Sequence, residues 1–223
     1  MFGWGVAQDK NFLAVMEKRL NKQYPRKIWE IINTGTPGYN TFMKVEALRT
    51  RALKYKPDLV LLQHTINDLL LPEFIYEYPD PWTTRRSFAY DFWFKEFSFK
   101  KQKFKMRFEG EFKEVPPGFE YMAGEEGFAR AFVGLRSMRK ELGFKVAMLV
   151  SHDHPVGIAN AIQRLSTKYD FHTLVRLHRT DDPSLIVSKT DLHPSVKGHR
   201  LMADAMLDFL HKKGVIQALA KRK

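Results

Sequence analysis

Three short groups of residues carry the side-chain types that acyl-transfer chemistry needs. The first is the loop over residues 33–38, N-T-G-T-P-G, which ends in Gly38; the second is Asn67 with Asp68; the third contains Asp191 and His193. A glycine N–H and an asparagine amide are donors suited to a developing oxyanion. A histidine with a nearby carboxylate is suited to act as a general base. The three groups together predict proton abstraction and oxyanion stabilisation at one site.

The elements that would position these groups alternate along the chain between helix and strand patterns. Apolar residues at helical spacing predict helices over residues 11–20, 39–55, 125–142 and 158–169, and a last helix through about residue 211. Short apolar runs predict buried strands over residues 28–32, 59–62 and 144–150, with a short strand at 173–177. The loops that follow parallel strands meet at the carboxyl edge of the sheet. The three groups are therefore expected at that edge.

Residues from about 70 to 124 interrupt this alternation. Aromatic residues there are interleaved with lysine and arginine, and Glu109-Gly110 sits where a tight hairpin turn would lie. We interpret the stretch as an insertion with a two-stranded excursion. Three roles stay open for it: a lid over the site, a membrane-surface or partner contact, and packing with solvated charges.

Composition and charge set further bounds. With 44% hydrophobic and 28% charged residues, the chain has an ordinary globular composition. It contains no cysteine, so disulfides and thiolate metal sites are excluded. A net charge of +12 suits nucleic acid, an anionic surface or acidic substrates, but also a solvated basic surface. No nucleic-acid motif is present, and neither a metal nor a cofactor is expected. His199 is expected to be structural, facing solvent or capping a helix.

Three segments in order resemble the SGNH (GDSL-type) hydrolases. They are I-I-N-T-G-T-P-G-Y-N-T, P-D-L-V-L-L-Q-H-T-I-N-D and D-L-H-P-S-V-K-G-H. The resemblance implies one SGNH-like domain over residues 1–223, a three-layer α/β/α flavodoxin-like fold with a parallel sheet. It also implies hydrolysis of a small-molecule or glycan acyl ester by serine chemistry. Gly38 and Asn67 would form the oxyanion hole, and His193 would be the base.

The sequence departs from the family pattern at two positions. Thr65 stands where the third block usually begins with glycine, and Thr190 stands where the family has its aspartate. Asp191 lies two residues before His193 instead of three. A triad completed by Asp191 and a serine–histidine dyad both stay open.

The family's Gly-Asp-Ser block and the first strand that carries it are absent. In many relatives that block is followed closely by a string like F-G-W-G-V, which here begins at Phe2. We therefore expect the nucleophilic serine upstream of Met1, in a longer protein of which Met1 is an internal residue. Ser151, after a predicted strand, is a distant substitute. The alternatives are a catalytically inactive SGNH-like protein that binds a glycan or acyl group, and a basic nucleic-acid-binding domain. The sequence indicates neither a compartment nor an oligomeric state.

Overall fold

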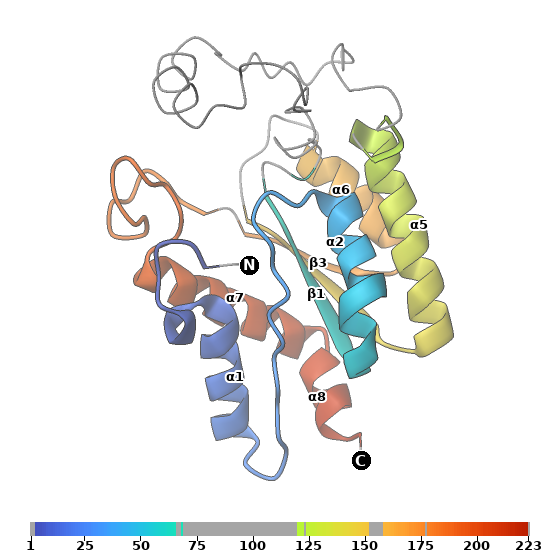
Figure 1. The fold of residues 1–223 in the computed structure, drawn as a ribbon. Helices are drawn as coiled ribbons and strands as arrows, with labels where there is room; N and C mark the ends of the chain where they lie inside the picture. Colours follow the sequence, from blue (N-terminus) through green and yellow to red (C-terminus); the bar gives the residue numbers. More distant parts are fainter. Residues whose placement is uncertain are drawn as a thin grey trace, which may run out of the picture.

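The computed structural model of the chain describes residues 3–65, 68, 120–122, 124–151, 158–176 and 178–222. Two helices precede the first strand of these residues, a helix lies between each strand and the next, and two helices follow the last strand (Figure 1). The elements are α1 (Phe12–Gln23), α2 (Thr41–Ala47), β1 (Leu59–His64), α5 (Gly124–Leu142), β2 (Lys145–Val150), α6 (Ile158–Lys168), β3 (His172–Val175), α7 (Val196–Lys212) and α8 (Val215–Ala220). Most of the insertion, including the predicted turn at Glu109-Gly110, lies outside the described residues.

The strands form one parallel sheet in the order β1-β2-β3 within the described residues. The register pairs Val60 with Val146 and Leu62 with Met148, and it pairs Ala147 with His172. These are the strands that the apolar runs at 59–62, 144–150 and 173–177 predict. The parallel α/β fold class is confirmed.

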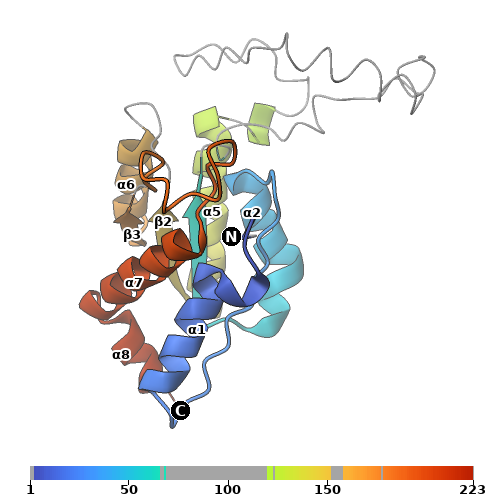
Figure 2. The ribbon, with the colours of Figure 1, turned by 90° about the vertical axis from the view of Figure 1, so that its left-hand side faces the viewer.

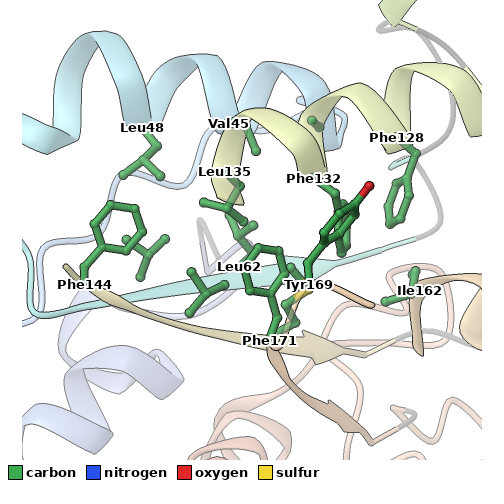
Figure 3. Close-up of a cluster of buried hydrophobic side chains, with 14 of the residues drawn as sticks. Val45, Leu48, Leu62, Phe128, Phe132, Leu135, Phe144, Ile162, Tyr169 and Phe171 are labelled. Atoms are coloured by element: carbon green, nitrogen blue, oxygen red, sulfur yellow. The ribbon is translucent and has the colours of Figure 1, made fainter. Parts of the chain in front are cut away.

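Alternate residues of each strand enter two separate cores, because successive side chains of a strand point to opposite faces. Val60 and Met148 face a core shared with α2, α5 and α6, in which Phe132 and Leu135 are fully buried (Figure 3). Ala147 and Leu149 face a second core shared with α1, α7 and α8. The two helix groups cover opposite faces of the sheet (Figures 1 and 2), which confirms the three-layer architecture.

The predicted strand at residues 28–32 is wrong: the segment is extended but pairs with no described strand. Its exposure still alternates as in a strand. Ile28 is 90% exposed and Ile32 is 42% exposed, whereas Trp29 and Ile31 pack against the second core. The apolar run predicted a buried strand, but a strand also needs a neighbour to share its backbone hydrogen bonds.

Within the described residues, β1 has no neighbouring strand at its outer edge. Lys145 N–H donates to the Asp58 carbonyl (2.9 Å) and Ser151 N–H donates to the His64 carbonyl (3.1 Å), so the even-numbered residues of β1 bond to β2. In a parallel ladder the intervening residues turn their backbone groups to the other side. Helix α1 supplies hydrogen bonds to the 28–32 segment instead. The Asn21 side-chain amide accepts from the Trp29 N–H and donates to the Trp29 carbonyl.

Asparagine side chains cap the first turns of α1 and α2. Asn11 accepts from the N–H groups of Leu13 and Ala14 at the start of α1, and Asn40 accepts from Met43 at the start of α2. The α2 pattern continues as a π-helical turn (Leu48–Ala52) and a 3-10 turn (Leu53–Tyr55). No helix of the described chain is long and apolar enough to cross a bilayer.

His199 on α7 is structural, as expected, and it does not face solvent. Only 4% of its surface is exposed. Its Nδ1 accepts a hydrogen bond from the Phe12 N–H at 3.2 Å, and its ring stacks on the Phe12 ring at 6.1 Å. The bond joins α7 to the first residue of α1.

Candidate active site

The predicted base lies in a closed loop that leads into α7. Within this loop Val187 N–H donates to the His193 carbonyl at 2.9 Å, and Ile186 pairs with Pro194 in an isolated β-bridge. Ser195 then caps α7 by accepting from Gly198 N–H. These backbone hydrogen bonds hold both ends of the loop, so they fix the position of the His193 backbone at the edge of the sheet.

Asp191 and His193 are in direct contact. His193 Nδ1 lies 2.6 Å from Asp191 Oδ1, and the His193 N–H donates to the same oxygen at 3.0 Å. These two hydrogen bonds lower the pKa of Asp191, the backbone bond first. The His193 side chain is 57% exposed, and its Nε2 bonds to no residue that the structure describes. The spacing of two residues therefore still allows the aspartate to orient the ring.

The glycine-rich turn at the start of the chain packs against this loop. The Trp4 ring lies 6.1 Å from the His193 ring, centroid to centroid. Gly5 has a φ of +77°, and a Cβ there would come within 2.6 Å of a Val187 methyl. Both the left-handed backbone and the close approach require glycine at this position. The turn that contains Trp4 and Gly5 therefore packs directly against the loop that carries the predicted base.

Gly38 is exposed in the loop that precedes α2. The start of α2 and the loop that leads into α7 lie toward the same end of the sheet (Figures 1 and 2). The φ of Gly38 is +74°, a conformation that glycine adopts without strain. No described residue accepts a hydrogen bond from its N–H, and none lies within 4 Å of where a Cβ would be. The N–H is therefore available as a donor, although Gly38 forms no hydrogen bond with Asp191 or His193.

Asn67, the second predicted oxyanion donor, lies outside the described residues, but its neighbour Asp68 does not. Asp68 is buried and accepts hydrogen bonds from the Thr41 hydroxyl (2.6 Å), from Lys44 Nζ (2.6 and 2.8 Å) and from the Thr65 N–H (2.5 Å). The carboxylate thereby ties the loop after β1 to the first turn of α2. This network joins the two segments that carry Gly38 and Asn67.

The charge balance of the network follows from its contacts. Burial would raise the pKa of Asp68, but the charge of Lys44, the nearby His64 and the hydrogen bonds from Lys44 outweigh it and hold the pKa far below its ordinary value. His64 is fully buried, and its Nε2 has no hydrogen-bond partner in the described chain. Sequence reasoning missed this cluster. The available signal was a lysine one helical turn after Thr41, facing the end of a buried strand.

Ser151, the substitute nucleophile, is buried and committed to other bonds. Its hydroxyl accepts from the Gln63 amide at 2.8 Å and donates to the His64 carbonyl at 3.1 Å. A nucleophile needs an exposed oxygen beside its base. The structure therefore argues against Ser151 in that role.

The chain has the fold of the SGNH (GDSL-type) hydrolases. It resembles a two-domain esterase active on acetylated mannans with a TM-score of 0.56 and 14% identity, covering 96% of this chain and 46% of that one. A putative lipolytic protein of the G-D-S-L family from Desulfitobacterium hafniense DCB-2 gives 0.54 and 13%, over 94% and 93% of the two chains. An acetyl xylan esterase gives 0.52 and 14%, over 92% of each.

These similarities establish the fold, since the identities are low. This chain spans about half the length of the two-domain esterase, at 46%. Neither a protein-family model nor a curated protein sequence matches the chain.

Proposed function

We propose that the chain carries the general base and the oxyanion donors of an acyl-ester hydrolase. His193 Nε2 takes the proton of a serine hydroxyl as its oxygen attacks the ester carbonyl, and the carbonyl electron pair moves onto the oxygen. The Gly38 N–H and the Asn67 amide stabilise that oxyanion. Collapse expels the alcohol, which His193 protonates, and water then releases the acyl group. The observation that carries the proposal is the 2.6 Å contact of His193 Nδ1 with Asp191, which leaves Nε2 for the serine.

The nucleophile in this proposal is a serine that precedes Met1 in the complete protein. The position of the first turn supports it, because the Trp4 ring lies against the His193 ring. A chain that enters this turn from its amino-terminal side would arrive beside the base. The open edge of β1 likewise offers a place for the strand that would carry such a serine.

The substrate proposed is an acyl ester of a small molecule or a glycan. A hollow of about 220 Å³ runs along α2 and begins one residue after Gly38, with Tyr39, Phe42 and Met122 in its lining. Aromatic faces of this kind suit a sugar ring or an acyl chain. Two similar structures act on acetylated mannans or xylan according to their names. We also propose that the insertion at about residues 70–124 contacts the substrate or a membrane surface. Most of this insertion lies outside the described residues.

A second candidate is a protein that binds the same ligands without turnover. The hydroxyls of Ser184, Ser188 and Ser195 are engaged in bonds within the His193 loop, and no described serine bonds to His193. If the complete protein has another residue in place of the upstream serine, the site retains donors and a base but has no nucleophile. Binding of an acetylated oligosaccharide without release of acetate would then be observed.

The test uses the protein extended through its native upstream sequence. We expect it to hydrolyse p-nitrophenyl acetate and to be labelled by a fluorophosphonate, which reacts with activated serines. His193→Ala should lower kcat/KM by about 10³-fold or more. His172→Ala, at the opposite edge of the sheet, is the matched control. Full activity in His193→Ala would refute the proposal, and an unlabelled extended protein would favour the binding function.

A further inference from the structure

A basic cleft of about 450 Å³ opens at the amino-terminal edge of the sheet, opposite the candidate active site. Its walls come from the end of α5, the turn into β2, the turn between α6 and β3, and the chain after α8. Six of the ten residues that line it are cationic and one is acidic. The cations are Arg136, Arg139, Lys140, Lys145, Lys168 and Arg222, and the acid is Asp170.

Two of the arginines hold the walls together. Arg139 donates to the carbonyls of Tyr169 (3.0 Å) and Asp170 (2.6 Å), and to the Asp170 carboxylate at 2.7 Å. These bonds fasten α5 to the turn before β3, where Asp170 has a φ of +57°. Arg222 pairs with Asp58 at 2.8 Å, which fastens the end of the chain to the start of β1. The charge of both arginines is thus balanced within the protein.

The other four cations of the lining have no carboxylate partner in the part of the chain that the structure describes. Arg136 and Lys168 both lie over the buried ring of Tyr169, at 5.4 and 5.5 Å from its centroid. Because the Tyr169 ring attracts both cations, their charges lie on the same wall of the cleft. Lys140 and Lys145 complete the basic lining from α5 and β2.

Cations at helix C-termini also have a simpler role, because they offset the helix dipole. Helices α5 and α6 both end at this cleft, with basic residues in their last turns. Each helix end supplies about half a negative charge. Even with both ends, Asp170 and Asp58 counted against the six cations, a surplus of about three positive charges remains. The helix dipoles therefore account for only part of the cluster.

His172, the first residue of β3, senses the resulting field. Burial lowers its pKa most, and the charges of Lys145, Lys213 and Arg139 lower it further, while only Asp170 acts in the opposite direction. A positive field at this edge opposes a further positive charge on the imidazole. A bound anion would offset the charges of these cations and so raise the pKa of His172.

We propose that this basic cleft binds a compact ligand with several phosphate groups, either a free oligophosphate or a phosphorylated lipid headgroup. Phosphates place several charges in a small volume and accept charge-assisted hydrogen bonds from lysine and arginine. A polymer of acidic sugars carries one carboxylate per ring, so a cleft of this size would hold too few charges to match the surplus. The proposal is independent of ester hydrolysis.

Calorimetry with inorganic tripolyphosphate tests the proposal on the full chain. Lys140→Gln combined with Lys168→Gln should weaken binding by about tenfold or more, because two charge-assisted contacts are lost. Both side chains are exposed, so the fold is kept. The matched control is Lys18→Gln with Lys22→Gln, two exposed lysines on α1 that change the net charge equally. Equal weakening in both variants would overturn the proposal.

Two further measurements locate and identify the ligand. The pKa of His172, followed by NMR, should rise when tripolyphosphate binds to the wild type. A pKa that stays fixed at saturation would overturn the site. Vesicles of phosphatidylcholine with phosphatidylinositol bisphosphate distinguish the sources: retention on them supports a lipid headgroup, and its absence beside tripolyphosphate binding supports a free ligand. Tighter binding of single-stranded RNA than of tripolyphosphate would overturn the proposal in favour of nucleic acid.

Discussion

Two aspartate–histidine pairs lie at the carboxyl edge of the sheet, and their surroundings differ in almost every respect. His64 and Asp68 are 0% and 2% exposed, with Nδ1 and Oδ1 3.6 Å apart. His193 and Asp191 are 57% and 27% exposed, with the same atoms 2.6 Å apart. Only the second pair forms a short contact while keeping its outer ring nitrogen in reach of a substrate.

The difference lies in what each carboxylate already binds. Asp68 accepts from Thr41, Lys44 and Thr65, so it is committed to holding two segments together. Asp191 accepts from the side chain of His193 alone and from that residue's own N–H. Residue types therefore do not distinguish a positioning cluster from a candidate catalytic pair. The burial of the side chains and the number of hydrogen bonds that each carboxylate already accepts do distinguish them.

The largest effect that tests this comparison is loss of the buried carboxylate. Asp68→Ala should lower the free energy of unfolding by about 3–5 kcal/mol, because it leaves the Lys44 charge without its partner in a largely buried site. Urea denaturation at pH 7 measures the loss. A change no larger than that of an exposed substitution would show that the network does not hold the loops.

A double variant separates the loss of the carboxylate from the charge that it leaves behind. Lys44→Met with Asp68→Leu removes both members of the pair and leaves apolar side chains of similar size. It should be more stable than Asp68→Ala alone, since no unpaired charge remains. If the double variant were the less stable of the two, the hydrogen bonds to Thr41 and Thr65 would dominate instead.

A third histidine, His199, allows the contrast between buried and exposed imidazole rings to be tested by measuring stability at different pH values. Burial is the main cause that lowers the pKa of His199 to about 4 from 6.5. The unfolded chain takes up this proton near pH 6.5, whereas the folded protein resists it until about pH 4. Stability should therefore fall as the pH drops from about 6.5 to 4.

The structural reason is the bond to α1. A proton on His199 Nδ1 would displace the hydrogen bond that this atom accepts from the Phe12 N–H. His199→Gln keeps an acceptor but does not titrate, so its stability should change less between pH 7 and 4.5. Urea denaturation at the two pH values gives the comparison. Asp68 has its pKa lowered below 3.8 in the folded state, so its own contribution is present above that pH and lost only below it.

The sequence predicted those parts of the fold that depend on local pattern. Helical spacing located α1, α5 and α7, and apolar runs located β1 and β2. The segment at 28–32 was mispredicted because a strand depends on a neighbour that periodicity does not reveal. Ile28 is 90% exposed there, whereas the apolar run predicted a buried residue.

For the site, the sequence placed Asp191 and His193 in one loop but left open whether they meet, and the structure brings them into contact. The sequence did not predict the network around Asp68, because Thr41, Lys44 and Thr65 come from two elements that only the tertiary fold brings together. The basic cleft was missed for the same reason. Its cations are spread along the sequence and appear there only as an excess of charge.

The smallest effect on stability is expected from the exposed pair. Asp191→Ala leaves the His193 ring in contact with water, so no charge is stranded in the interior, and the free energy of unfolding should equal that of the wild type within error. In the extended protein the same substitution should lower kcat by about 10³-fold or more, because the ring loses the partner that orients it and stabilises its charged form. An unchanged kcat would establish a serine–histidine dyad. The pair at the surface would then share with the buried pair only its residue types.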